Sequence, residues 1–218
     1  MTTKEPFKKL VNQGLILGED GEKMSKSRGN VVNPDEVVKE YGSDSLRLYE
    51  MFMGPLEKVK PWSANGITGV YNFLNRGHRF IMDPANISPD TTEDLEISKM
   101  LHKTIKKVSE DINDLRFNTG ISQMMICLNL FTKKKIVTKK SAETFCLILS
   151  PYAPHLAEEL WQHLGHQKSL ALETWPSFDA DLAKDDIVEM AVQFNGKMRG
   201  VLNVSPDISK EDFIIKIK

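Results

Sequence analysis

Residues 101–115 read LHKTIKKVSEDINDL, and the spacing of their apolar side chains decides what kind of fold this chain adopts. Apolar residues recur at alternating intervals of four and three residues, from Leu101 to Leu115. Positions at this spacing lie along one side of an α-helix and can pack against a neighbouring helix. The pattern therefore predicts a helix from about residue 93 to residue 115 with one buried seam.

Helical periodicity continues on both sides of this seam. Upstream, one apolar stripe predicts a helix over 63–81, and two shorter helices precede it. The first begins at Asn33-Pro34, an N-cap followed by proline at the first helical position, and the second ends near Gly54. The helices predicted downstream begin near residues 118, 141 and 154. Several antiparallel helices with short links predict a mainly α fold, an antiparallel helix bundle.

The apolar spacing changes near the C-terminus. Apolar residues alternate with polar or small ones over 188–194 and again over 198–204, and Asn195-Gly196 between them is a strong hairpin signal. Ser209 resembles the N-cap of one more helix. Because a hairpin and one helix form no stable core alone, we expect the chain to end inside a truncated small α+β domain.

Composition sets few limits on function. The 218 residues carry a net charge of −1, but residues 61–140 hold 12 Lys and Arg against 8 Asp and Glu. A basic middle segment is a modest pointer to a polyanionic partner, although a solvated lysine-rich helix face explains it equally well. Cys127 and Cys146 lie in apolar helical patterns and are interpreted as core residues. No metal site, secretory signal or membrane span is expected.

The string KMSKSRGN at residues 23–30 is the strongest candidate for chemistry. It places two ammonium groups, two hydroxyls and a guanidinium on a glycine-flanked loop. Such a loop could close over a triphosphate and stabilise charge that grows in the transition state. A generic basic surface loop is the alternative when only the chemistry is considered.

Five letters of this string match the KMSKS signature of class I aminoacyl-tRNA synthetases, and the chain resembles the leucyl-tRNA synthetase family, bacterial type, over nearly its whole length. The further matching segments are RLYEMFMGP (47–55), RFNT (116–119), SPYAPH (150–155), EELW (158–161) and VQFNGK (192–197). The valyl and isoleucyl families share the loop and remain alternatives.

This resemblance implies a domain organisation and an activity. Residues 1–60 would hold the KMSKS loop and a stem-contact segment, 61–176 a helical anticodon-binding-type domain, and 177–218 a linker with the start of the α+β piece. The family activates leucine with ATP and Mg²⁺ to leucyl-adenylate and transfers it to tRNA(Leu). The loop binds ATP and stabilises the departing pyrophosphate. The implied catalytic residues are Lys23 and Lys26, and the implied ATP-binding residues are Lys23, Met24, Ser25, Lys26 and Ser27.

The family's catalytic half also needs a His-x-Gly-His signature on a Rossmann fold. The string His163-Leu164-Gly165-His166 follows the KMSKS loop and ends a predicted helix, so we interpret Gly165 as a helix stop. We therefore expect a C-terminal fragment that is inactive alone. A stand-alone RNA-binding module derived from such an enzyme is the alternative.

The resemblance further implies that the helical domain contacts the body of the tRNA. Basic residues along its helices are the candidate phosphate contacts. They are Arg76, Arg79, Arg116, Lys133, Lys134 and Lys135. Trp62 is expected to anchor the start of a helix rather than to stack on a base, and Trp161 is expected in the core. The complete enzyme is expected to be cytoplasmic and monomeric.

Overall fold

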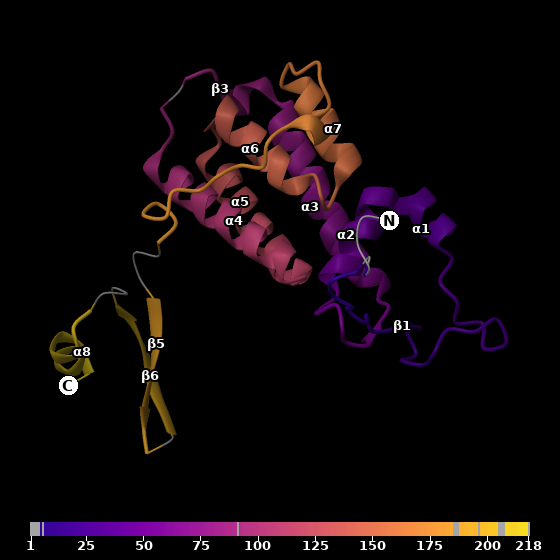
Figure 1. Ribbon diagram of the computed structural model, residues 1–218, viewed down its shortest axis with the longest axis horizontal. Coiled ribbons are helices and arrows are strands. Elements are labelled where there is room, and N and C mark those ends of the chain that lie inside the picture. The colour runs from indigo at the N-terminus through magenta and orange to yellow at the C-terminus, as the bar shows by residue number, and fades with distance from the viewer. Residues whose placement is uncertain are drawn as a thin grey trace.

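The computed structural model describes residues 5, 7–90, 92–184, 188–195, 197–204 and 208–217. It is mainly helical, as predicted, with short strands (Figure 1). The helices are α1 (Pro34–Tyr41), α2 (Ser43–Phe52), α3 (Ala64–Met82), α4 (Leu95–Asn113), α5 (Phe117–Lys134), α6 (Lys139–Leu149), α7 (Pro154–His163) and α8 (Lys210–Ile217), with short 3₁₀ turns at Pro84–Asn86 and Leu170–Leu172. The strands are β1 (Ile16–Leu17), β2 (Lys60–Pro61), β3 (Ile87–Ser88), β4 (Val137–Thr138), β5 (Val188–Phe194) and β6 (Lys197–Val204).

Helices α3 to α7 form the bundle, with its core where their apolar faces meet. Leu101, Ile105 and Val108 on the predicted seam of α4 are all buried. The antiparallel pair α4 and α5 runs along one side, and α3, α6 and α7 cover the other (Figure 1). Aromatic rings fill the centre, where Phe131 packs against Phe145 with ring centroids 5.7 Å apart. The helices predicted from spacing are therefore the ones that build the core.

Side chains at the helix ends explain where these helices begin and stop. Asn33 Oδ1 accepts a hydrogen bond from Asp35 N–H at 3.1 Å and caps α1, as predicted. Asp94 Oδ1 caps α4 through the amides of Glu96 and Ile97, and Thr138 caps α6. Every helix in the described part of the chain is too short or too polar to cross a bilayer.

Helix α2 joins the N-terminal region to the bundle. The buried Asp44 carboxylate accepts hydrogen bonds from Leu156 N–H at 2.7 Å and from His155 Nδ1 at 2.8 Å, at the start of α7. Arg47 Nη2 donates to the carbonyl oxygen of Pro151 at 3.0 Å. Upstream of α2, strand β1 pairs in parallel with β2. These contacts attach α2 to α7 and to the turn before it, and they attach β1 to the strand that leads into α3.

The C-terminal elements stand apart from the bundle in Figure 1. Strands β5 and β6 form the predicted antiparallel hairpin, with Phe194 opposite Lys197 and a bulge between Val192 and Gln193. Gly196 of the predicted turn lies outside the described residues. Residues 173–184 lead to the hairpin across α4, where Trp175 Nε1 donates to Ser109 Oγ at 2.8 Å.

Candidate functional site

The signature string lies on a loop, residues 18–30, which we call the flap. Strand β1 leads into the flap and is fixed to β2, with Ile16 opposite Lys60. Gly18 N–H donates to the carbonyl oxygen of Glu22 at 2.8 Å and closes the first turn. Gly21 and Gly29 have φ of 73° and 71°, in the left-handed region that favours glycine. The glycines therefore let the chain reverse on both sides of the signature.

Asn30 holds the two arms of the flap together. Its Nδ2 donates to both oxygens of Asp20, at 3.1 and 3.0 Å, and its Oδ1 accepts from Ser25 N–H at 2.9 Å. Two hydrogen bonds hold the pKa of Asp20 below its ordinary value. The larger effect comes from the Asn30 amide and the smaller from the Glu22 backbone N–H. This pair was not predicted from the sequence, although Asp before Gly in a loop is a known signal for side-chain-closed turns.

The signature residues divide into inward and outward groups. Met24 is half-buried and packs against the apolar core, and Ser25 Oγ lies 3.2 Å from Ser27 Oγ. Lys23 and Lys26 are exposed, and within the described residues neither ammonium group has a hydrogen-bond or carboxylate partner. The flap thus presents two positive charges on a backbone that its own side chains hold in shape.

Three of the predicted phosphate contacts lie on α3 and α5, close to where the two helices meet. Arg76 of α3 donates from Nη1 to Asn129 Oδ1 of α5 at 2.9 Å. Lys133 follows Asn129 by one helical turn on the same face, is exposed, and has no ion-pair partner among the described residues. Arg79 is exposed one turn after Arg76, and its Nε donates to the carbonyl oxygen of Asn75. These cations form what we call the α3–α5 face.

The other candidate cations have different surroundings. Arg116 Nε donates to the buried Asp111 carboxylate at 3.0 Å, and its Nη2 lies 2.8 Å from Asp114. Lys134 Nζ lies 2.7 Å from Glu96 and 2.9 Å from Asp94, and these hydrogen bonds raise its pKa. Arg116 also lies at the opposite end of α5 from Lys133, about 26 Å away along the helix axis.

Lys135 ends α5 and is exposed. Its φ of 70° is unusual for a residue with a side chain, and its N–H donates to the carbonyl oxygen of Phe131 at 2.9 Å. The structure therefore brings Lys133 and Lys135 together at one end of the bundle. It does not bring Arg116 to them.

Trp62 and Trp161 are buried, as predicted. Trp62 packs edge-on against Tyr49 at 5.0 Å beside the start of α3. Gly165 has φ of 98° directly after α7, which confirms it as a helix stop. His166 stacks on Trp161, and its Nε2 lies 2.7 Å from Glu143. The His-x-Gly-His string is thus part of the bundle's own packing.

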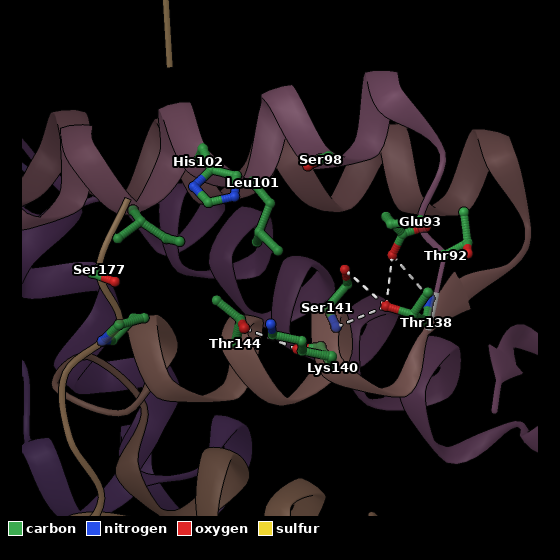
Figure 2. A pocket seen from close by; sticks show the side chains of 12 residues that line it. Thr92, Glu93, Ser98, Leu101, His102, Thr138, Lys140, Ser141, Thr144 and Ser177 are labelled. Atoms are coloured by element: carbon green, nitrogen blue, oxygen red, sulfur yellow. Dashed lines mark hydrogen bonds between the residues drawn. The ribbon is translucent and has the colours of Figure 1, made fainter. Parts of the chain in front are cut away.

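A hollow of about 690 Å³ lies between α4 and α6 where residues 176–177 cross (Figure 2). Its polar groups largely satisfy one another. Glu93 Oε2 accepts hydrogen bonds from Thr138 N–H at 3.0 Å and Thr138 Oγ1 at 2.9 Å, and Ser141 N–H donates to Thr138 Oγ1. None of the predicted site residues lines it, so we assign it no role.

Comparisons with known proteins match two separate parts of the chain to tRNA ligase families. The family described as "Anticodon-binding domain of tRNA ligase" matches residues 94–215, and "tRNA synthetases class I (I, L, M and V)" matches residues 1–60. The leucine–tRNA ligase of Chlorobaculum parvum is 51% identical over 100% of this chain. That of Leptospira biflexa is 54% identical over 97%. The chain spans 27% and 25% of the length of these two relatives.

Solved structures of two tRNA synthetases resemble this chain as well. A LeuRS of Agrobacterium radiobacter, in a ternary complex with tRNA and LeuAMS, superimposes with a TM-score of 0.75 at 31% identity, over 99% of this chain and 29% of that one. Mycobacterium tuberculosis methionyl-tRNA synthetase shares the fold, with a TM-score of 0.57 at 19% identity over 72% of this chain and 39% of that one. The chain therefore belongs to the family of tRNA ligase anticodon-binding domains, its residues 1–60 match the class I tRNA synthetases, and its relatives at about 50% identity are leucine–tRNA ligases.

Proposed function

We propose that this chain supplies the ATP-facing flap and part of the tRNA-binding surface of a leucine–tRNA ligase. The complete enzyme would activate leucine with ATP and transfer it to tRNA(Leu). The observation that carries the proposal is the pair of exposed ammonium groups of Lys23 and Lys26 on the flap, which have no carboxylate partner in the described part of the chain. Identity near 50% to leucine–tRNA ligases favours leucine over the valine and isoleucine alternatives, and favours an enzyme segment over a separate RNA-binding module.

The flap acts on the first step of this reaction. A carboxylate oxygen of leucine attacks the α-phosphorus of ATP, and the bond from that phosphorus to the bridging oxygen breaks. Pyrophosphate then leaves with the bonding electrons. Negative charge grows on the leaving group as the bond breaks, so a lysine that meets it stabilises the transition state more than the ground state. We assign this role to Lys26, with Lys23 beside it.

The other signature residues shape the ATP site. Met24, Ser25 and Ser27 would contact ATP through the flap backbone and the two hydroxyls. Mg²⁺ would enter with ATP and neutralise its phosphates. The described residues include no cluster of three or more His, Cys, Asp or Glu side chains that could hold a metal, so we assign Mg²⁺ no ligand from this part of the chain.

The α3–α5 face would contact the phosphates of the tRNA. The face consists of Arg76, Arg79 and Lys133, and Lys135 lies beside it. All four side chains are exposed, and none belongs to the carboxylate pairs of Lys134 and Arg116. Free cations neutralise phosphates most effectively, because a paired cation must first give up its carboxylate. We propose that Lys134 acts at the edge of this surface, and that Arg116 contacts a separate phosphate at the other end of α5. The complete enzyme would work as a cytoplasmic monomer.

Replacement of Lys26 tests the flap assignment. In a complete ligase that contains this chain, Lys26→Ala is expected to lower kcat for leucine-dependent ATP–pyrophosphate exchange by about a hundredfold. Lys58→Ala removes an equally exposed lysine outside the flap and is expected to leave the rate unchanged. Equal rates for Lys26→Ala and the unmodified enzyme would refute the assignment.

Charge reversal tests the tRNA surface. The double variant Lys133→Glu and Lys135→Glu is expected to weaken tRNA binding and to reduce the slope of log K against log salt by about one per lost phosphate contact. Lys210→Glu changes one exposed charge on α8, which stands apart from the bundle in Figure 1, and serves as the control. If the double variant binds tRNA no more weakly than the control, this cluster has no place in the tRNA surface.

A further inference from the structure

The N-terminus of α3 receives its cap from a distant part of the chain. Ser63 is the N-cap residue, but its side chain makes no capping hydrogen bond. Instead, Ala64 N–H donates to Glu19 Oε1 at 3.0 Å, although the two residues are 45 positions apart. Ser63 N–H donates to Tyr49 Oη of α2 at 3.0 Å. Two amides at the start of α3 are thus satisfied by α2 and by the flap.

Glu19 is well placed to hold the flap. It is the second residue of the flap, and its carboxylate lies at the positive end of a 19-residue helix, where a negative charge is favoured. A Cβ on the preceding Gly18 would lie 2.7 Å from Asp20 Oδ1 and 2.8 Å from Asn30 Nδ2, so a side chain there would displace the hydrogen-bonded pair Asn30 and Asp20. The hydrogen bonds between Asn30 and Asp20 therefore also constrain the flap base around Glu19.

Besides Glu19, the flap contacts the bundle through Met24, which packs against the apolar core. A hollow of about 350 Å³ lies between the flap base and Trp62, which precedes α3, and its lining includes Glu19, Asn30 and Val32. Within the described residues, no other side-chain hydrogen bond joins residues 18–30 to α3. The Glu19 carboxylate is thus the polar connection across this hollow.

We propose that Glu19 is a positioning residue that anchors the flap to the N-terminus of α3 and so sets where Lys23 and Lys26 stand. The inference rests on the proposed function, in which the flap meets the leaving pyrophosphate. An anchored base reduces the conformational freedom that the flap must lose when it closes over ATP. Because the flap contacts are strongest in the transition state, loss of the anchor should lower kcat more than it raises KM for ATP.

Hydrogen exchange on this chain without ligand tests the anchor directly. Glu19→Ala is expected to speed exchange of the Ala64 amide and of the flap amides about fivefold, the factor of a typical capping hydrogen bond. Glu22→Ala is the matched control, since it removes another flap carboxylate that faces Arg28 at 3.9 Å and not α3. Unchanged protection of Ala64 in Glu19→Ala would overturn the inference.

Pyrophosphate exchange in a complete ligase that contains this chain separates this inference from the proposed function. We expect Glu19→Ala to lower kcat about fivefold with less than a twofold change in KM for ATP, and Glu19→Gln, which keeps the acceptor oxygen, to recover part of the rate. If Lys26→Ala lowers the rate but Glu19→Ala does not, the positioning role is wrong and the proposed function stands. If neither variant changes the rate, the proposed function fails as well.

Discussion

Replacing Asp111 should destabilise the bundle far more than replacing its exposed neighbour Asp114. The Asp111 side chain is fully buried between α4 and α5 and accepts hydrogen bonds from Lys107 Nζ at 2.6 Å, from Arg116 Nε at 3.0 Å and from the Thr119 hydroxyl. The turn that it supports includes Leu115 at φ 59°, a conformation that side chains rarely adopt. Asp111 therefore holds both the end of α4 and the start of α5.

The exposure of its partners sets the size of the effect. Removing one member of a buried charge pair costs about 3–5 kcal/mol when its partners stay buried. Lys107 and Arg116 have side chains that are 38% and 51% exposed, so both can turn to water after the change. We therefore expect Asp111→Ala to lower the free energy of unfolding by about 3 kcal/mol, at the low end of that range.

Urea unfolding followed by circular dichroism measures this value, since the m-value reports whether the unfolded state has changed as well. Asp114→Ala is the matched control. It removes a carboxylate that pairs with the same Arg116 at 2.8 Å, but its side chain is 56% exposed, so little change in stability is expected. If the two variants lose the same stability, the burial argument is wrong.

Three further predictions concern the titration of Asp111, the reactivity of the two cysteines and the packing at Gly66. Burial raises the pKa of the Asp111 carboxyl, but hydrogen bonds from Lys107, Thr119 and Arg116 outweigh it, so the folded-state pKa lies below the ordinary value. Its contribution to stability is then full above the unfolded-state pKa of about 3.9 and is lost as pH falls through the folded-state pKa, so the stability gap between wild type and Asp111→Asn should narrow below about pH 4 in urea titrations. Burial raises the pKa of both Cys127 and Cys146 to about 12. Neither thiol should therefore react with a chromogenic disulfide reagent at pH 8 until urea unfolds the chain, and the absorbance of the released reagent thiolate measures the reaction. Gly66→Ala would put a Cβ 2.6 Å from the Tyr49 ring and should lower the unfolding free energy by about 1–3 kcal/mol, measured by thermal denaturation.

The helices of this chain were predictable because their signals are local. The four–three spacing in α4 and the caps at Asn33 and Gly165 are each complete within a few residues. The hairpin was predictable for the same reason, since alternation over 188–194 needs no distant information. By contrast, the pairs β1–β2 and β3–β4 are two residues long and join segments far apart, so they leave no period in the sequence.

Partners of charged side chains were not predictable, because ion pairs across helices leave no pattern in a sequence. Arg116 and Lys133 look alike as basic residues near helix ends. In the structure Arg116 is bound to a buried carboxylate, whereas Lys133 has no ion-pair partner among the described residues. For the same reason the role of Glu19 was not predicted, because only its hydrogen bond to Ala64 distinguishes it from any other loop glutamate. The signature string was predicted, and the residues that hold it in place were not.

Helix α3 gives these separate observations a common physical basis. Its N-terminus binds the flap through Glu19, and Arg76 stands 12 residues further on, about 18 Å along the same rigid rod. A packed helix transmits position without bending, since its core side chains allow few alternative arrangements. A phosphate bound at Arg76 and a triphosphate bound at the flap would thus both be positioned relative to the same helix, α3. Because neither end of α3 can shift without moving the other, the position of the flap depends on how α3 packs in the bundle. Under the proposed function, this packing would couple the flap over ATP to the surface that binds tRNA.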